Sequence, residues 1–310
     1  MEERSFSVRI TEENAGRRVD EVLRAVLGMS ARQIRLIKAQ KGFYLDGRPV
    51  YANAPVAPGQ TLTAVCRDAY DQGIEPEEGA LAILFEDDHL LILDKPAPMA
   101  TLPEPGRMHG TLANLVAAHL AQKNFIFRPV NRLDRGTSGI LVTAKHPLAQ
   151  KRLMDVLHTD AFVRTYEAIA DGLIRLDSLC IDAPIGRLDG DSVRRCVRAD
   201  GKPARTDLTV LARYPLTNRT RVLLRLHTGR THQLRVHLAH IGHPVTGDAL
   251  YGAPCLQLPD RFALHSAHLR LVHPFTGRLL ELDSPLPPQL VGLTGAKAAV
   301  SPLQRQDFGL

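Results

Sequence analysis

The chain has 310 residues, of which 44% are hydrophobic and 23% are charged, enough for one sizeable buried core and a second small domain. Thirty-nine lysines and arginines against thirty-three aspartates and glutamates give a formal charge of +6, which moderately favours a polyanionic partner. No run of about 18 apolar residues occurs and the first ten residues lack the apolar stretch of a secretory signal, so we expect a cytoplasmic protein with no membrane span.

The first 67 residues are predicted to form a small basic unit. Its second helix has Ser30 as a plausible N-cap and carries far more basic than acidic residues, which favours a nucleic-acid surface over an ordinary solvated face. The basic residues are Arg32, Arg35, Lys38 and Lys41. The expected elements are a strand at 6–10, helices at 17–27 and 31–40, two short strands joined at Asp46-Gly47, and a strand at 60–66.

Residues 68–79 lose the apolar periodicity, gain acidic side chains and contain Pro76, so we interpret them as a solvated linker. Mixed α and β patterns begin at residue 81. Lys95 follows a buried strand, where it could approach a phosphate or simply cap the strand end. The expected elements are strands at 81–87 and 89–95 and a helix from Thr111 to about Gln122.

Residues 131–145, NRLDRGTSGILVTAK, carry the most chemistry. Asp134 lies between Arg132 and Arg135, and a carboxylate held ionised by positive charge can act as a nucleophile, a base or an anion ligand. Taken alone, the pattern is more typical of a surface loop, because most Arg/Asp clusters are structural ion pairs. GTSG lacks the spacing of a hydrolase nucleophile elbow, which argues against Ser138 as the nucleophile.

Further α and β elements follow this motif. A basic loop at Arg194, Arg195 and Arg198 is expected to reach toward phosphates. Residues 291–310 turn small and polar and are expected to be a flexible tail. The expected elements are helices at 147–158 and from about Arg230, strands at 162–170, 204–212 and 221–227, and two closing strands joined at 274–277.

Four histidines in and around the helix expected from about Arg230 raise the question of a metal site. They occur without an H-E-x-x-H motif, and one helix cannot converge all of them. The four cysteines are far apart with no C-x-x-C pair, which argues against a zinc knuckle or a disulfide framework. We therefore expect no metal site. The histidines are His232, His237, His240 and His243.

Several segments together resemble the RluA-type pseudouridine synthases. Residues 131–145 resemble the family motif H-R-L-D-x-x-T-S-G, with Asn131 where the family usually has His. FVRTYEAIADG resembles a second motif, with Arg164 in place of Lys and Tyr166 as its aromatic residue. GRTHQLRVH resembles a third motif almost letter for letter, and DKPAPMATLP resembles a fourth more weakly.

The resemblance implies an α+β fold with a mixed, mostly antiparallel central sheet, peripheral helices and an active cleft between the halves of the sheet. Periodicity by itself indicates only mixed α and β. Residues 80–290 would be the catalytic domain, and residues 1–67 resemble the alpha-L RNA-binding module found on many pseudouridine synthases.

The implied function is isomerisation of specific uridines to pseudouridine in structured RNA, ribosomal or transfer, by a monomer with no cofactor or metal. Asp134 would be the essential carboxylate, paired with Arg235, and could attack the ribose or add to the uracil ring. Tyr166 would stack on a flipped uracil, and Arg132 would fill the space that the nucleotide leaves. The other implied substrate-binding residues are Asn131, Arg164, Arg230, His232 and Gln233.

Two alternatives remain open at this point. A catalytically inert RNA-binding or ribosome-assembly protein could retain the same cleft. An RNA hydrolase could use Asp134 with His232. The joint presence of Asp134, Tyr166 and Arg235 favours the isomerase.

Overall fold

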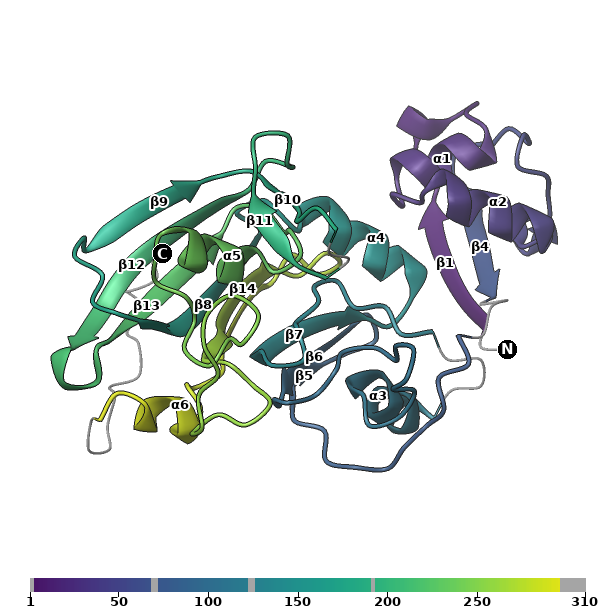
Figure 1. The fold of residues 1–310 in the computed structure, drawn as a ribbon. Helices are drawn as coiled ribbons and strands as arrows, with labels where there is room; N and C mark the ends of the chain where they lie inside the picture. Colours follow the sequence, from purple (N-terminus) through teal and green to yellow (C-terminus); the bar gives the residue numbers. More distant parts are fainter. Residues whose placement is uncertain (1–2, 68–71, 122–125, 191–192, 296–310) are drawn as a thin grey trace.

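The computed structural model describes residues 3–67, 72–121, 126–190 and 193–295. Figure 1 shows a small N-terminal unit beside a larger body that is built on a long, twisted sheet. None of the helices in these ranges is both long and apolar enough to cross a lipid bilayer.

The N-terminal unit is a four-stranded antiparallel sheet covered by two helices. Apolar residues at helical spacing bury one side of each helix, and Ser30 caps the second through reciprocal bonds with Gln33, as predicted. Asp46 and Gly47 both have positive φ, the geometry of the expected tight hairpin. The elements are β1 (Glu3–Arg9), a 3₁₀ turn (Glu12–Asn14), α1 (Val19–Ala25), α2 (Ala31–Ala39), β2 (Phe43–Leu45), β3 (Arg48–Pro49) and β4 (Thr61–Arg67), in sheet order β1-β4-β2-β3.

The body contains a nine-stranded sheet in which β7 and β14 pair in parallel and the other described pairs are antiparallel. This confirms the mixed, mostly antiparallel sheet of an α+β fold. The strand order is β5-β6-β7-β14-β8-β13-β12-β9, with β15 on β14. The strands are β5 (Ile83–Glu86), β6 (Leu90–Lys95), β7 (Ser138–Ala144), β8 (Phe162–Asp171), β9 (Ser178–Asp182), β12 (Arg205–Tyr214), β13 (Arg219–Leu226), β14 (Leu264–Val272) and β15 (Leu279–Asp283).

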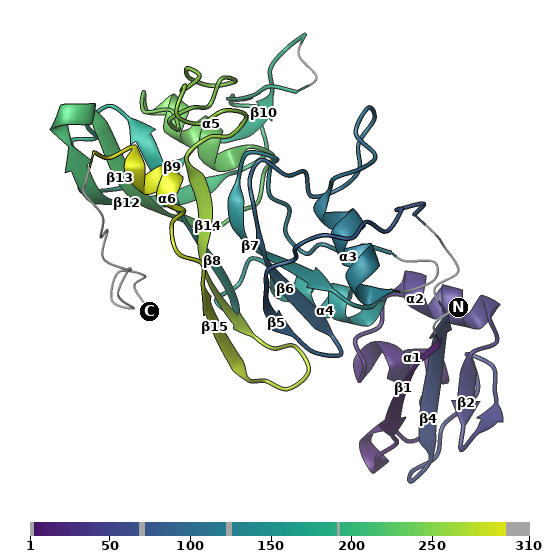
Figure 2. The same ribbon diagram turned by 90° about the horizontal axis from the view of Figure 1, so that it is seen from below.

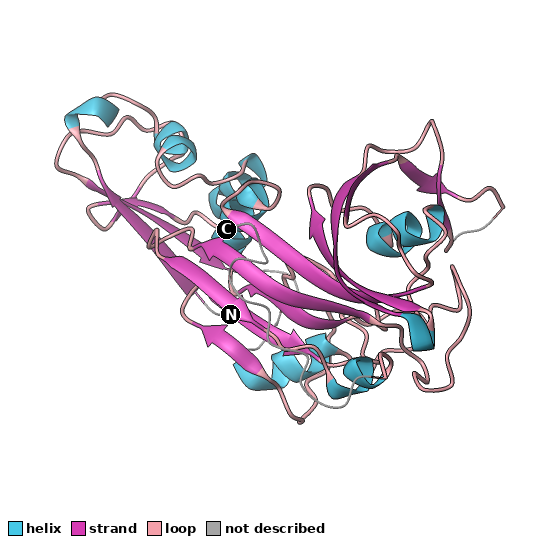
Figure 3. Ribbon diagram, turned by 90° about the vertical axis from the view of Figure 1, so that its left-hand side faces the viewer, coloured by secondary structure: helices cyan, strands magenta, loops and turns pink. Residues whose placement is uncertain are grey.

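Helices lie around this sheet, as Figures 1 and 3 show. A separate hairpin of two short strands stands at one end of the sheet, near α5. These elements are α3 (Leu112–Leu120), α4 (Pro147–Val156), β10 (Ile185–Arg187), β11 (Arg195–Val197), a 3₁₀ turn (Pro215–Thr217), α5 (Gln233–His240) and α6 (Pro288–Gly292).

The parallel contact between β7 and β14 joins the two halves of the sheet, and it requires glycine at position 139. Gly139 has φ +103, and a Cβ there would lie 2.2 Å from the carbonyl oxygen of Ser266 on β14. No side chain fits so close to another backbone. The small residues that end the 131–139 motif therefore allow the halves to meet directly beside the loop that carries Asp134.

The N-terminal unit packs on the body through α4 and the turn between β14 and β15. Leu148 and Phe275 join the apolar cluster of the N-terminal unit. Phe6 contacts the ring of His146, and Arg152 donates a hydrogen bond of 3.2 Å to the carbonyl of Leu27. Figure 2 shows the same arrangement from below.

The linker and the tail make contacts with the body that the sequence did not predict. Residues 68–71 lie outside the described residues. Most of residues 72–79 are exposed, but Ile74 is buried in the core and Glu77 bonds the backbone of Gly110, so this segment is attached to the body at two points. At the other end, α6 covers residues 288–292 and Leu293 is buried. Apolar burial thus extends past the expected boundary at 290. Residues 296–310 and the predicted helix end at Gln122 lie outside the described residues.

Two further expectations need correction. Between residues 171 and 204 the sequence predicted only a basic loop at Arg194, Arg195 and Arg198, because Gly and Pro interrupt any strand pattern there. The structure has β9 and the β10–β11 hairpin in this region, with Arg195 on β11. The helix expected from about Arg230 begins at Gln233, because His232 adopts a left-handed conformation with φ 58.

Candidate active site

Asp134 lies on a loop directly before β7. The segment that follows β6 forms hydrogen bonds with the backbone of this loop. Thr101 donates a hydrogen bond of 2.7 Å to the carbonyl of Leu133, and the N–H of Met99 donates to the carbonyl of Arg135. The N–H of Thr137 closes a turn on the carbonyl of Asp134 itself. The loop backbone is therefore fixed, while the Asp134 side chain remains one-third exposed.

Arg235 reaches Asp134 from α5. Its Nη1 lies 2.9 Å from Asp134 Oδ2, so the pairing expected from the sequence is present. Its Nε and Nη2 donate to the two oxygens of Asp248, at 2.6 and 2.8 Å. Burial alone would lower the pKa of Arg235, but hydrogen bonds and charge from Asp248 and Asp134 outweigh burial and raise it. The guanidinium is a permanently charged clamp between two carboxylates.

Aromatic rings complete the surroundings of this clamp. The Arg235 guanidinium lies 4.3 Å from the centre of the Phe262 ring and 5.0 Å from that of Tyr251. A planar cation over ring faces is stabilised by the negative quadrupole of each ring. These contacts leave Arg235 only 8% exposed and restrict it to one orientation.

A narrow pocket of about 70 Å³ opens beside Asp134. Tyr166, on β8 between β14 and β13, is almost fully buried in its wall. Arg132, at the loop, is exposed. The pocket brings together most of the residues that the resemblance implied, namely Arg132, Asp134, Tyr166, Arg230, His232, Gln233 and Arg235.

His232 stands next to the carboxylate. Its Nε2 lies 3.8 Å from Asp134 Oδ2, and its Nδ1 lies 2.8 Å from the hydroxyl of Tyr251. Burial lowers the pKa of His232, although the charge of Asp134 acts in the opposite direction. The N–H of Arg195 donates to the same hydroxyl oxygen, and the phenol retains a proton that it can donate to Nδ1. With that bond made, a neutral His232 carries its proton on Nε2, the side that faces Asp134.

Two implied substrate-binding residues lie elsewhere. Asn131 is buried behind the loop, where its amide accepts a hydrogen bond of 2.8 Å from the N–H of Val142 and fixes β7. Arg164 is also buried, with its guanidinium 5.5 Å from the centre of the Phe162 ring. Neither side chain lines the pocket. Strand alternation puts Arg164 and Tyr166 on the same face of β8. Both faces of β8 are covered, however, and of these two residues Tyr166 alone lines the pocket.

Gln233 lines the pocket, and its side-chain amide is already hydrogen-bonded to other groups of the protein. Its Oε1 accepts from the N–H of Arg230 at 3.0 Å, and its Nε2 donates to the carbonyl of Arg205 at 3.0 Å. The side chain thus supports the turn that carries Arg230 and His232.

Two residues that sequence reasoning missed belong to the site. Asp248 and Tyr251 come from GDALYG, which carried no signal beyond its turn residues. For Lys95 the sequence left phosphate contact or strand capping open; it is fully buried at the end of β6 and donates to the carbonyls of Pro96 and Met99, so it caps the strand end. Burial lowers the pKa of Lys95 to about 7, although the nearby charge of Asp134 acts to raise it.

The other histidines of this region point to separate partners. His237 bonds Thr206 and the carbonyl of Ala183, and His243 bonds the carbonyl of Asp171. In the part of the chain that the structure describes, no three histidine, cysteine, aspartate or glutamate side chains gather as they would around a metal ion.

Comparison with known proteins gives a consistent result. The family model for RNA pseudouridylate synthase matches residues 89–240, a span that includes both Asp134 and Arg235. The chain is 38% identical to the uncharacterized RNA pseudouridine synthase YhcT of Bacillus subtilis, over 94% of this chain and 96% of that protein. It is 37% identical to ribosomal large subunit pseudouridine synthase D of Nitrosomonas europaea, over 95% and 88% of the two chains.

A solved structure, human RNA pseudouridylate synthase domain containing 1, superimposes with a TM-score of 0.57 at 28% identity, covering 75% of this chain and 95% of that one. Fold, site and relatives therefore agree: the chain belongs to the RNA pseudouridine synthases. Within that family it is of the RluA type, as the sequence motifs indicated. The protein is an isomerase that acts on RNA.

Proposed function

We propose that this protein converts specific uridines of structured RNA to pseudouridine with Asp134 as its essential carboxylate and without a cofactor. The observation that carries the proposal is the fixed chain Asp248–Arg235–Asp134 at the mouth of the pocket. Arg235 keeps the Asp134 carboxylate aimed at the pocket, whose wall contains the buried Tyr166. A carboxylate is a competent nucleophile when it is ionised and positioned in this way.

The reaction detaches the uracil, rotates it and reattaches it through carbon, so no atom or electron is gained or lost. Asp134 can attack the anomeric carbon or add to the uracil ring, and both routes need the base out of its helix. The pocket of about 70 Å³ is far smaller than the roughly 300 Å³ of typical ligand sites. A base therefore enters only if rim side chains move, and the exposed Arg132 is the one best placed to do so.

Ribosomal RNA is the substrate class that the comparisons favour. Several relatives that align with nearly the whole chain are named ribosomal large subunit pseudouridine synthase D. Transfer RNA is the second candidate. We place the enzyme in the cytoplasm, where either RNA is found.

In this proposal residues 80–290 catalyse and residues 1–67 bind RNA. The supporting feature is the basic surface of α2 and its C-terminal turn, where the cationic side chains are exposed and make no ion pair among the described residues. Phosphate contacts of this kind supply most of the affinity of RNA-binding surfaces. The residues are Arg32, Arg35, Lys38 and Lys41.

Pseudouridine mapping in cells with and without the gene tests the proposal. A pseudouridine that disappears from one RNA and returns with the wild-type gene, but not with Asp134→Asn, supports it and identifies the target. An inert binding protein predicts an unchanged map. A hydrolase predicts RNA cleavage by the purified protein that Asp134→Asn abolishes.

A further inference from the structure

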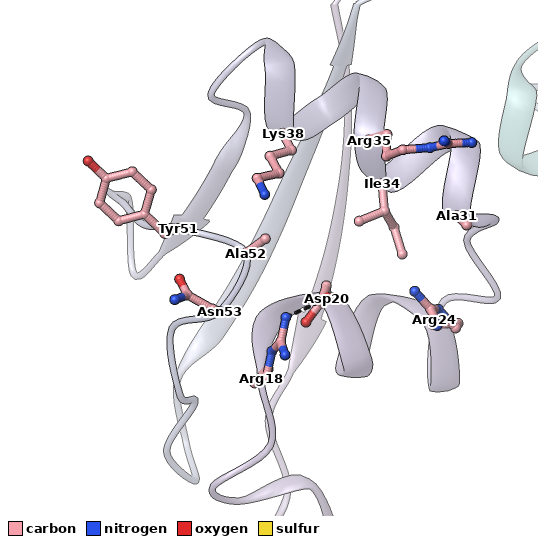
Figure 4. Close-up of a pocket in the computed structure, with 10 residues that line it drawn as sticks. All are labelled: Arg18, Asp20, Arg24, Ala31, Ile34, Arg35, Lys38, Tyr51, Ala52 and Asn53. Atoms are coloured by element: carbon pink, nitrogen blue, oxygen red, sulfur yellow. Dashed lines mark hydrogen bonds and ion pairs between the residues drawn. The ribbon is translucent and has the colours of Figure 1, made fainter.

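The N-terminal unit carries a hollow of about 770 Å³, which is within the size range of ligand-binding pockets. Figure 4 shows the side chains that line it, which come from α1, α2 and the turn after β3. Its polar lining comprises four cations, one carboxylate, a tyrosine and an asparagine. The residues that matter here are Arg18, Arg24, Arg35, Lys38, Tyr51 and Asn53.

Regular secondary structure fixes the walls of this hollow. Ile34, Arg35 and Lys38 recur at helical spacing on one side of α2, with the buried Ile34 as the floor. The opposite wall is a turn in which the N–H of Ala54 bonds the carbonyl of Tyr51 at 3.0 Å. The first N–H groups of α1 bond the carbonyls of Ala52 and Ala54, so the turn is tied to the helix start.

The charge in the hollow is largely uncompensated. Arg18 pairs with Asp20 at 3.0 Å, the only acidic side chain in the lining. Arg24, Arg35 and Lys38 form no ion pair within the described ranges, and all three are exposed. Unpaired cations around a concave surface attract anions more strongly than the same cations on a convex one.

Tyr51 distinguishes this hollow from a simple phosphate site. Its side chain is 83% exposed, although a tyrosine ordinarily buries most of its ring. Asn53 projects from the same turn and can both donate and accept hydrogen bonds, as the edge of a base requires. In Figure 4 the Lys38 ammonium extends from α2 into the space between these two residues and the helix.

We propose that this hollow binds one unpaired nucleotide of the RNA substrate, with its base stacked on Tyr51 and its edge bonded to Asn53. The flanking phosphates contact Lys38, Arg35 and Arg24. An A-form duplex offers phosphates but keeps its bases stacked inside, whereas loops and bulges expose base faces that aromatic rings bind. The inference rests on the proposed RNA-binding role of residues 1–67 and specifies a looped or bulged strand as the ligand.

The basic residues of α2 and its C-terminal turn fall into two pairs. Arg35 and Lys38 line the hollow, whereas Arg32 and Lys41 do not. Arg35 and Lys38 should therefore contribute most of the affinity that is specific for a looped strand. Arg32 and Lys41 remain available for general phosphate contacts.

The test measures binding of full-length protein to a labelled RNA hairpin with a single-stranded loop and to a blunt duplex of equal length. Base–aromatic stacking is worth about 1 kcal/mol or more, so Tyr51→Ala should raise the Kd for the hairpin at least about fivefold and leave the duplex Kd unchanged. Tyr51→Phe retains the ring face and should keep most of the affinity. Thermal unfolding of Tyr51→Ala should match wild type, because the ring is so exposed.

A second variant tests the phosphate contacts. Lys38→Ala should reduce the slope of log Kd against log salt by about 0.7 on the hairpin. The control is Arg48→Ala, at an exposed cation of the same unit that lies outside the hollow. It tests unspecific charge and should change hairpin and duplex binding equally. Equal losses on hairpin and duplex for Tyr51→Ala, or no loss on either, overturn the inference. Pseudouridine formation is measured separately, so wild-type activity in an Asp134→Asn variant would refute the proposed function and leave this binding result unaffected.

Discussion

Asp248 holds Arg235 with a bidentate pair of hydrogen bonds while it is itself only 1% exposed. Two parallel N–H···O bonds define the plane of the guanidinium as well as its position. The remaining nitrogen then points at Asp134. Asp248 therefore sets the direction in which Arg235 holds the Asp134 carboxylate, without itself lining the pocket.

Asp134→Asn should abolish the release of tritium from uracil labelled at carbon 5, while RNA affinity stays close to that of wild type. The amide retains the shape and hydrogen bonding of the side chain but is no longer a nucleophile. The measurement is tritium release by purified protein beside a binding titration. Wild-type release by this variant would end the assignment of Asp134.

Asp248→Asn should lower both activity and stability. Removing one partner of a buried ion pair leaves an uncompensated charge at a cost of about 3 to 5 kcal/mol, although Asp134 still compensates part of it here. Denaturant unfolding and tritium release measure the two effects. The matched control is Asp177→Asn, which breaks the exposed pair with Arg213 and should cost about 1 kcal/mol or less.

Arg132→Ala should slow turnover far more on a structured RNA than on a flexible oligonucleotide. A long planar cation can fill the space that a flipped base leaves, and only a structured substrate has to be opened. Single-turnover rates on the two RNAs give the comparison. Equal losses on both would assign Arg132 to general binding.

Lys95 should make stability pH-dependent. Its pKa is about 7 in the folded protein and near 10.5 in the unfolded chain, so between these values the unfolded state binds more protons. The free energy of unfolding therefore rises with pH across this window, by on the order of a few kcal/mol. Below about pH 7 both states are protonated and the buried charge is destabilising throughout. Denaturant titrations should show the free energy of unfolding of wild type rising across this window relative to that of Lys95→Met, and parallel curves would exclude the effect.

Deleting residues 1–70 should weaken RNA binding and flatten its salt dependence while the body stays folded. The exposed cations of α2, which we propose contact phosphates, are lost, but the nine-stranded sheet and its core are retained. A salt titration of the truncated protein and its circular dichroism spectrum check both parts. Leu148 and Phe275 become exposed in this variant, so replacing Phe275 by a polar residue is a useful control for solubility.

The sequence predicted most elements of regular structure and the Asp134–Arg235 pair, because local patterns are strong there. Ser30, Pro147 and Asp46-Gly47 each act within one turn of the chain, and such signals survive folding. The pairing of Arg235 with Asp134 came from the family motifs rather than from periodicity.

The remaining errors involve contacts that tertiary structure decides. Asn131 could have faced either the pocket or β7, and the backbone N–H of Val142 determines the outcome. The contact of Asp248 with Arg235 could not be predicted, because it depends on how α5 packs against the turn that follows it. The packing of Ile74 and Leu293 likewise depends on partners distant in sequence.

The position of β14 has a consequence for synthesis of the chain. β7 and β8 follow each other in the sequence, yet β14, made more than a hundred residues after β7, lies between them. Until β14 emerges from the ribosome, β7 and β8 each have an unpaired edge and the two halves of the sheet cannot join. Such long-range pairing is slow, and exposed strand edges invite aggregation. A nascent chain that stalls before residue 264 would therefore be the form most in need of a chaperone.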